Sequence, residues 1–134
     1  MIKLLIFDFY GVLFNAQDYQ IDDELLNYIK ELRGKYKIAL LSNIHQSTFD
    51  RIIAKKPGAR ELFEVIATSH EIGYAKPSKQ AYTFVCEALQ IEPKRCLMID
   101  DSPINCRGAE EAGLSAVLYS GVADLKIKID KINN

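Results

Sequence analysis

The sequence predicts an α/β domain in which a doubly wound parallel sheet of about five strands is flanked by helices. Short apolar runs recur along the chain, and patterns typical of amphipathic helices separate them. The runs are rich in Ile, Leu and Val and lack clean polar alternation, as expected of strands that are buried on both faces. Strands that alternate with helices imply a parallel sheet covered on both sides.

Five segments have the length and composition of such strands. The first carries an apolar run that ends on a lone carboxylate, Asp8. The predicted strands cover residues 3–9, 37–41, 64–68, 96–99 and 115–119.

Helical patterns fill the intervals between the predicted strands. Asp22 can cap a first helix that ends at Gly34, and a second helix around residues 49–53 precedes Pro57. Ser78 can cap a third helix.

The last two helices are predicted on different grounds. Ser102 followed by Pro103 is typical of a helix start, and this fourth helix should end near Gly113. From Ala123 onward the apolar residues fit both an alternating and a helical spacing, and we predict a helix.

Composition limits the kinds of function. The chain of 134 residues, 49% hydrophobic and 26% charged, fits one domain spanning residues 1–134. A formal net charge of −1 gives no electrostatic case for nucleic acid or a membrane as partner. The three cysteines are an odd number without a C-x-x-C pair, and the apolar run at residues 2–7 is too short for a signal sequence or a span. We therefore expect a cytoplasmic protein.

Polar residues follow three of the predicted strands. Asp8 ends the first, Ser42 and Asn43 follow the second, and Asp100 and Asp101 follow the fourth. Any one of them could be a turn or helix-capping residue. Because ligands of doubly wound sheets bind beyond the carboxyl ends of the strands, their joint occurrence predicts a functional site.

Four segments of the chain together resemble the motifs of the haloacid dehalogenase superfamily of phosphohydrolases and related enzymes. They are FDFYGV, LLSN, EIGYAKP and MIDDSPIN, and their order and spacing cover nearly the whole chain. The resemblance implies a Rossmann-like core of this superfamily. It also implies that Asp8 is a nucleophile, that Ser42 and Asn43 bind the transferred group, and that Lys76 assists them.

The resemblance further implies a magnesium site and a phosphorylated substrate. Asp8, the backbone carbonyl of Tyr10, Asp100 and Asp101 would hold the ion. Asn105 would support them, and backbone amides near Gly11 would contact the substrate. Attack by an aspartate on a phosphoryl group brings two anions together, and a hard cation with oxygen ligands offsets their repulsion.

Tyr10 departs from the phosphatase pattern. Phosphatases of the superfamily usually have a second aspartate here, which acts as general acid and base. A phenol with an unperturbed pKa of about 10 is a poor substitute near neutral pH. Tyrosine at this place is similar to the 2-haloacid dehalogenases, which work without metal. We expect a weak phosphatase and keep a dehalogenase or a catalytically silent binding module as alternatives.

The intervals between the motifs leave no room for an inserted lid. An open site suggests a large substrate, a lid from another subunit of a homo-oligomer, or a site that no longer turns over. The two histidines, His45 and His70, lack the company of other metal ligands and are expected as surface or capping residues.

Overall fold

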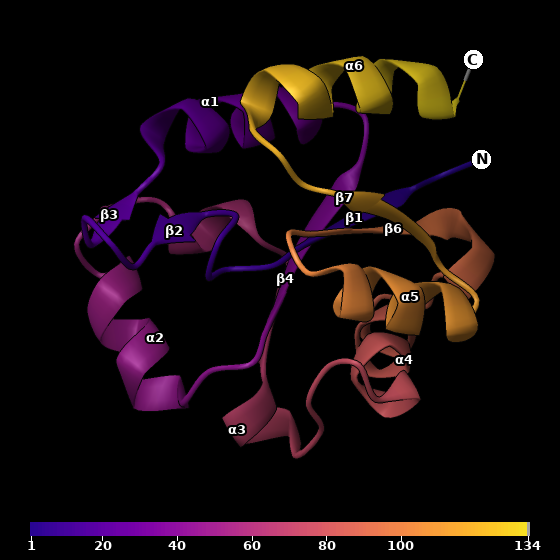
Figure 1. Ribbon diagram of the computed structural model, residues 1–134, viewed down its shortest axis with the longest axis horizontal. Helices are drawn as coiled ribbons and strands as arrows, with labels where there is room; N and C mark the ends of the chain where they lie inside the picture. Colours follow the sequence, from indigo (N-terminus) through magenta and orange to yellow (C-terminus); the bar gives the residue numbers. More distant parts are fainter. Residues whose placement is uncertain (134) are drawn as a thin grey trace.

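A computed structural model describes residues 1–133 as a five-stranded parallel sheet flanked by helices (Figure 1). The strand order is β5-β4-β1-β6-β7, and each neighbouring pair is parallel. The predicted fold class is therefore confirmed. The strands are β1 (Leu4–Phe7), β4 (Lys37–Ser42), β5 (Val65–Thr68), β6 (Cys96–Asp100) and β7 (Ser115–Leu118).

Helices cover both faces of this sheet. In Figure 1, α1 and α6 lie together on one side of the sheet, whereas α4 and α5 lie together on the other. Both pairs also touch in the contact pattern, so each face has its own helical layer. The longer helices are α1 (Asp23–Leu32), α2 (Gln46–Ile53), α4 (Lys79–Ala88), α5 (Pro103–Glu111) and α6 (Val122–Ile132).

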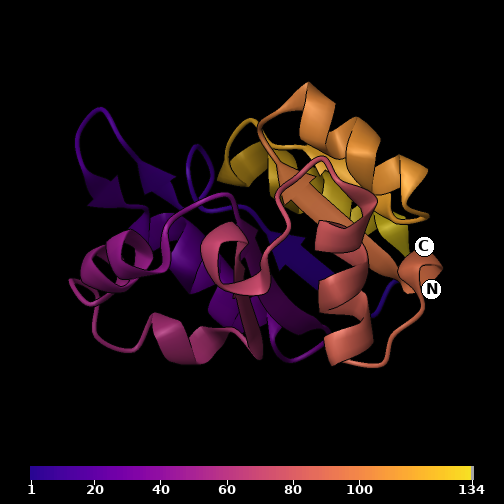
Figure 2. The same cartoon turned by 90° about the horizontal axis from the view of Figure 1, so that it is seen from below.

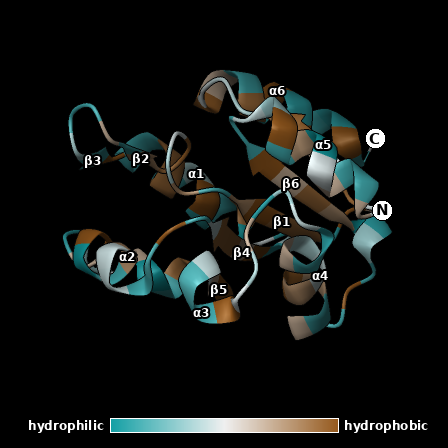
Figure 3. Ribbon diagram, turned by 60° about the horizontal axis from the view of Figure 1, so that its bottom comes forward, coloured by the Kyte–Doolittle hydropathy of each residue, from teal (hydrophilic) through white to brown (hydrophobic). Residues whose placement is uncertain are grey.

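The central strand β1 explains why the sequence shows no polar alternation. Leu5 and Phe7 belong to one apolar cluster, and Leu4 and Ile6 belong to the other. Because successive side chains of a strand point to opposite faces, β1 must be apolar throughout to fill both clusters. In Figure 3 the strands at the centre are hydrophobic, whereas the helices around them alternate between hydrophilic and hydrophobic residues.

Several helix boundaries follow from capping groups that the sequence already indicated. The Asp22 side chain accepts a hydrogen bond from the backbone N–H of Leu25, and that of Ser102 accepts one from Asn105. Pro103 stands in the first turn of α5, where its missing N–H has no cost. Ser78 precedes α4 as predicted, although its side chain makes no capping hydrogen bond.

The C-terminal segment forms a helix, as its helical spacing predicts. Val122, Leu125 and Ile129 are its buried residues. The Asn133 side chain then binds the backbone of Ile2, accepting from its N–H at 3.0 Å and donating to its carbonyl at 3.2 Å. The two ends of the chain accordingly lie close together (Figure 2). No helix within residues 1–133 is both long and apolar enough to cross a bilayer.

A small hairpin between β1 and α1 was not predicted. It consists of β2 (Phe14–Asn15) and β3 (Gln20–Ile21), and it stands apart from the main sheet in Figure 1. Strands of two residues are too short to give a periodic signal. The Phe14 ring fixes the hairpin, stacking on Phe9 with 5.4 Å between ring centroids. Apart from this hairpin, the described chain has no insertion between β1 and α1.

Three further short elements complete the fold. The sequence patterns did not indicate them, because each is only three or four residues long. They are η1 (Arg60–Leu62), α3 (Ser69–Ile72) and η2 (Pro93–Arg95).

The order of the strands locates the edge where a ligand would bind. In chain order the main strands are arranged third, second, first, fourth and fifth, so the winding reverses at β1. Ligands of such sheets bind at this switch point, outside the carboxyl ends of the strands. Asp8 follows β1 and Asp100 ends β6, its hydrogen-bonded neighbour.

A glycine allows α5 to approach the loop that carries Lys76. A Cβ atom on Gly108 would lie 2.6 Å from Cβ of Pro77 and 2.8 Å from its carbonyl oxygen. Glycine in a helix interior is unfavourable compared with alanine, so this close approach is a physical reason for its presence.

We expect Gly108→Ala to lower the free energy of unfolding by about 1–3 kcal/mol, because the added methyl group must displace Pro77. Urea unfolding followed by circular dichroism measures the change. Gly34→Ala is the matched control, since a Cβ there would lie 3.5 Å from its nearest neighbour, the Glu31 carbonyl. Equal stability of the wild type and the Gly108 variant would contradict the close contact.

Candidate active site

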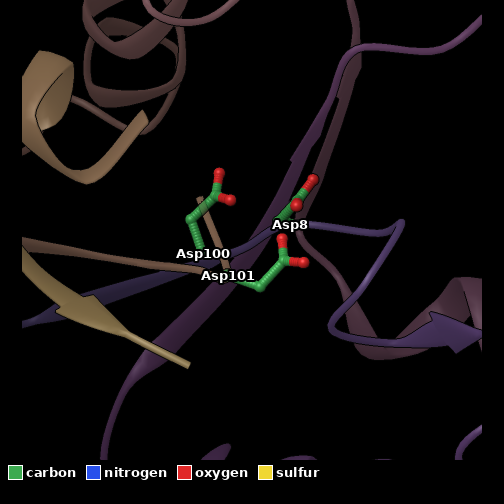
Figure 4. Close-up of side chains that lie close together, drawn as sticks. All are labelled: Asp8, Asp100 and Asp101. Carbon is green, nitrogen blue, oxygen red and sulfur yellow. The ribbon is translucent and has the colours of Figure 1, made fainter. Parts of the chain in front are cut away.

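Three carboxylates converge at the carboxyl edge of the sheet. Asp8 follows β1, Asp100 is the last residue of β6, and Asp101 comes next. One oxygen of each lies within 4.8 Å of the others. Figure 4 shows these side chains gathered beside the ends of the two strands. Asp8 and Asp100 are buried, whereas Asp101 is exposed.

Lys76 connects two of these carboxylates. Its Nζ atom donates to Oδ1 of Asp8 and to Oδ2 of Asp100, both at 2.8 Å. The lysine is only 4% exposed, so both ion pairs are shielded from solvent. One ammonium group facing three carboxylates leaves an excess of negative charge that favours a bound cation.

The two buried carboxylates are further fixed by the backbone. Asp8 Oδ1 also accepts a hydrogen bond from the N–H of Phe9 at 2.8 Å, and Asp100 Oδ1 accepts one from Ser102 at 3.0 Å. Both oxygens of Asp100 therefore already have a donor. This arrangement suits an indirect role for Asp100 more than direct attack or coordination.

Asn43 holds the backbone of Lys76. Its amide nitrogen donates to the Lys76 carbonyl at 2.9 Å, and its amide oxygen accepts from the Lys76 N–H at 2.8 Å. These two hydrogen bonds fix the loop backbone at Lys76, and the contact of Asn43 with the transferred group that the resemblance implies stays a prediction. Its place after β4 was predictable, whereas its partner lies 33 positions away in the chain.

Ser42 presents an unpaired hydroxyl group at the same edge. It is the last residue of β4 and is 1% exposed. Among the described residues, its Oγ is the buried side-chain oxygen or nitrogen atom that has no hydrogen-bond partner. A buried polar group without a partner is costly, so an oxygen atom of a bound anion at this position would be stabilising.

Gly11 fits closely against Asp101. Its φ of +83° lies in the left-handed region, and a Cβ on it would be 2.1 Å from Oδ2 of Asp101. Only glycine meets both demands. The loop after β1 thus touches the outermost carboxylate and borders the site.

The Tyr10 ring packs against aromatic side chains at the base of the β2–β3 hairpin. Its edge packs against Phe9 at 5.8 Å and against Phe14 at 5.6 Å between centroids. The residue remains 37% exposed. The ring therefore forms part of the surface near Asp8. No larger inserted segment covers it in the described chain.

Asn105 acts through its backbone in the first turn of α5. Its N–H donates to Ser102 Oγ at 3.3 Å, and its carbonyl accepts from the Tyr82 hydroxyl at 2.7 Å. These contacts hold the start of α5 directly after Asp101. A supporting role for the Asn105 side chain stays a prediction.

Burial changes the acidity of the site. Removal from water raises the pKa of Asp8 to about 7, although the neighbouring Lys76 opposes the change. Burial also raises the pKa of Asp101, and the negative charge of Asp100 adds to this effect. Carboxylates that resist ionisation when no metal is bound are typical of a site that needs additional positive charge.

The donor set suits magnesium. This ion prefers oxygen ligands, and protein sites usually provide one or two carboxylates together with water. Asp8 and Asp101 can provide these carboxylates, and the unpaired Ser42 hydroxyl can donate a hydrogen bond to an anion. The carboxylates at this edge therefore suit magnesium, and the Ser42 hydroxyl suits the oxygen of a phosphoryl group.

Comparison with protein families agrees with the fold and the motifs. The model of the haloacid dehalogenase-like hydrolases matches residues 10–113, which is most of the chain. The chain therefore belongs to the haloacid dehalogenase-like hydrolase family.

Curated relatives include proteins named as phosphatases. Phosphatase MT3486 of Mycobacterium tuberculosis is 33% identical over 86 residues, which cover 64% of this chain and 40% of that protein. The bifunctional riboflavin kinase/FMN phosphatase of Arabidopsis thaliana is 27% identical over 115 residues, which cover 78% of this chain and 30% of that protein. The chain thus spans well under half the length of these relatives.

Solved structures share the fold. An uncharacterised protein from Corynebacterium glutamicum is 26% identical with a TM-score of 0.79, covering 96% of this chain and 93% of that one. A HAD family enzyme of Bacteroides thetaiotaomicron, bt-2542, was solved with magnesium and inorganic phosphate. It has a TM-score of 0.81 at 23% identity and covers 93% of this chain and 99% of that one.

We expect Asp8→Asn to make the metal-free protein more stable at pH 8, by about 1–3 kcal/mol, because it removes a buried charge. The folded-state pKa of Asp8, about 7, exceeds its ordinary value of 3.8. The folded wild type therefore binds more protons than the unfolded chain between these values, and its stability falls as the pH rises through them. The gain from the substitution should shrink toward pH 4.

Urea unfolding in EDTA at pH 8 and pH 5 measures this difference. Glu110→Gln, which removes an exposed carboxylate of α5, controls for the loss of one negative charge. A variant that is less stable than the wild type at pH 8 would contradict the unfavourable burial of Asp8.

Proposed function

We propose that the chain is a magnesium-dependent phosphohydrolase in which Asp8 is the nucleophile. The observation that carries this proposal is the cluster of Asp8, Asp100 and Asp101, in which the ammonium group of Lys76 pairs with the first two. The names of the curated relatives support the phosphatase class.

In this reaction the Asp8 carboxylate attacks phosphorus, and the bond from phosphorus to the leaving oxygen breaks. The leaving group takes a proton from water, and an aspartyl phosphate remains on Asp8. Water then attacks the phosphorus, which releases inorganic phosphate and restores the carboxylate. Asp8 is held for this attack through Oδ1 by Lys76 and Phe9.

The neighbouring groups stabilise the charge that moves during transfer. Lys76 holds Asp8 in place and contributes positive charge next to the phosphoryl oxygens. The free Ser42 hydroxyl donates a hydrogen bond to one of these oxygens. The N–H of Gly11, which the resemblance implied as a further donor, is instead taken by the Phe14 carbonyl at 2.9 Å. Magnesium, held by Asp8, Asp101 and the Tyr10 carbonyl with Asp100 acting through water, would offset the repulsion between the two anions.

Tyr10 makes this a weak enzyme toward ordinary phosphate esters. Its ring is occupied by contacts with Phe9 and Phe14, and a phenol is a poor acid or base for this step near neutral pH. Loss of general acid and base help typically costs about 100- to 10,000-fold in rate. The substrate is therefore a phosphorylated compound with a good leaving group, or one that supplies its own proton.

The lack of a lid over the site limits which substrates or subunits can cover it. With only the short hairpin beside Asp8, the substrate is a phosphorylated macromolecule, or a second subunit of a homo-oligomer covers a small one. Exclusion of water strengthens the charge interactions on which the reaction depends.

Tyr10 also supports a second candidate, a dehalogenase that releases a halide, because such a leaving group needs no proton. The cluster of three carboxylates argues against it, since a reaction without metal gains nothing from that excess of negative charge. Assays of phosphate esters and 2-haloacids with and without magnesium separate the two, and activity on neither would indicate a silent binding module.

We expect Asp101→Asn to weaken magnesium binding at least about 10-fold, because a neutral amide replaces a charged ligand. Isothermal titration calorimetry measures the affinity. Asp124→Asn, which neutralises a partly exposed carboxylate of α6, is the matched control and should bind as the wild type does. Unchanged affinity in the Asp101 variant would remove this residue from the metal site.

We expect Tyr10→Asp to raise magnesium-dependent hydrolysis of an alkyl phosphate about 10-fold or more. The gain should be smaller for an aryl phosphate, whose leaving oxygen needs less protonation. The ratio of kcat/KM for glycerol 3-phosphate and for para-nitrophenyl phosphate is the measurement.

Asp8→Asn should abolish both activities, because an amide is a far weaker nucleophile than a carboxylate. Circular dichroism must show that each variant is folded, since Tyr10 packs against two rings. A ratio that does not move toward the alkyl ester would mean that Tyr10 does not occupy the acid/base position.

A further inference from the structure

A stacked pair of histidines stands at the same edge of the sheet as the carboxylates. The rings of His45 and His70 lie 3.6 Å apart between centroids at an interplanar angle of 25°. Both residues are exposed. They come from different elements, since His45 precedes α2 and His70 lies in α3.

The hydrogen bonds of the pair indicate which ring nitrogen carries the proton. His45 Nδ1 accepts from the N–H of Ser47 at 3.4 Å, and His70 Nδ1 accepts from the N–H of Gln46 at 3.5 Å. His45 Nδ1 also lies 2.9 Å from Ser47 Oγ, a contact in which either atom can donate. The tautomer in which both Nδ1 atoms accept has the proton of each neutral ring on Nε2, and the anion site proposed below uses this tautomer. In this tautomer the Nε2–H groups are the remaining ring donors of the two exposed residues.

The pair is held by buried neighbours. The Thr68 hydroxyl donates to Oε1 of Gln46 at 2.5 Å, which joins the first residue of α2 to the end of β5. The carbonyl of Ile44 accepts from the N–H of His70 at 3.4 Å. On α2, the charge of Asp50 is already paired with Arg60, so it does not oppose an anion at the histidines.

The strand register gives the distance from the catalytic carboxylate. Ser42 at the end of β4 pairs with Thr68 at the end of β5, and the histidines follow these two residues closely. In the sheet β4 is the neighbour of β1 and β5 is the neighbour of β4, so the two histidines follow strands one and two places from the strand that carries Asp8. Figure 3 shows α3 beside α2 next to this edge.

We propose that His45 and His70 bind a second anionic group of the substrate, so that the substrate is a bisphosphate or a phosphorylated carboxylate. This rests on the proposed function, because Asp8, Ser42 and Lys76 receive the phosphate that is transferred. Two N–H donors on stacked rings can match two oxygens of one anion, and the positive end of the α2 dipole favours the same charge. The helix N–H groups bound to Nδ1 also polarise the rings and strengthen their outward donors.

The chain offers a direct measurement, because it contains only two histidines. Each gives one imidazole Cε1–H signal in a proton NMR spectrum of untagged protein, and His45→Asn and His70→Asn assign them. Asparagine is a good N-cap residue, so the variant at position 45 keeps the start of α2. Fructose 1,6-bisphosphate and fructose 6-phosphate are titrated into Asp8→Asn protein with saturating magnesium at pH 7.5.

We expect both signals to move with fructose 1,6-bisphosphate, which should bind about 10-fold more tightly than the monophosphate because of two added charge-assisted hydrogen bonds. 6-Phosphogluconate, titrated in the same way, distinguishes a carboxylate from a phosphate as the second anion. In the His45→Asn and His70→Asn variants the preference for two anionic groups should disappear.

The kinetic counterpart is the ratio of kcat/KM for fructose 1,6-bisphosphate to that for fructose 6-phosphate in protein with an intact Asp8. This ratio should fall about 10-fold in either histidine variant. Phe84→Asn, which removes an exposed ring of α4, is the control and should leave the ratio unchanged.

The outcomes separate this inference from the proposed function. Imidazole shifts with the bisphosphate but no turnover by the wild type would support the anion site and refute the phosphohydrolase. Turnover without imidazole shifts, and with an unchanged ratio in the variants, would overturn the anion site alone. Equal shifts with fructose 6-phosphate would also overturn it, because the second anionic group would then contribute nothing.

Discussion

The buried bridge from Lys76 to Asp8 and Asp100 is the interaction on which the site depends. Two carboxylates from neighbouring strands can share one interior place only if a cation joins them, since each buried charge is costly alone. The chain brings that cation from a distant loop and fixes it at the backbone through Asn43. The contact of Gly108 with Pro77 holds the next residue of the loop against α5. The sheet thus contacts the side chain of Lys76, and α5 contacts the next residue of the same loop.

The bridge does not balance the charge. Asp101 remains as an acid that Lys76 does not contact, and Ser42 remains as a hydroxyl without a partner. Such incompletely satisfied groups lower the stability of the empty protein and are common where a ligand completes the arrangement. The excess negative charge and the unpaired hydroxyl therefore support the proposed ligand, a cation together with an anion.

The sequence predicts the sheet and the edge because both depend on local patterns and one general rule. Apolar runs identify the strands, and parallel strands place Asp8, Ser42 and Asp100 at one edge. The partner of Asn43 could not be predicted, because it depends on how a loop 33 positions away returns to the sheet. The stack of His45 on His70 likewise arises only when α2 and α3 pack together. The hairpin was missed because its strands are too short to show a period.

That hairpin makes the chain a convenient scaffold for engineering. Residues 15–20 at its tip are all exposed, while Phe14 at its base is anchored on Phe9 in the core. Exposed loop tips accept inserted segments far better than buried elements do. A helical module spliced between residues 16 and 18 would be carried on a fixed base beside Asp8, without disturbing the sheet. The same core could in this way be fitted with interchangeable covers that select substrates by size.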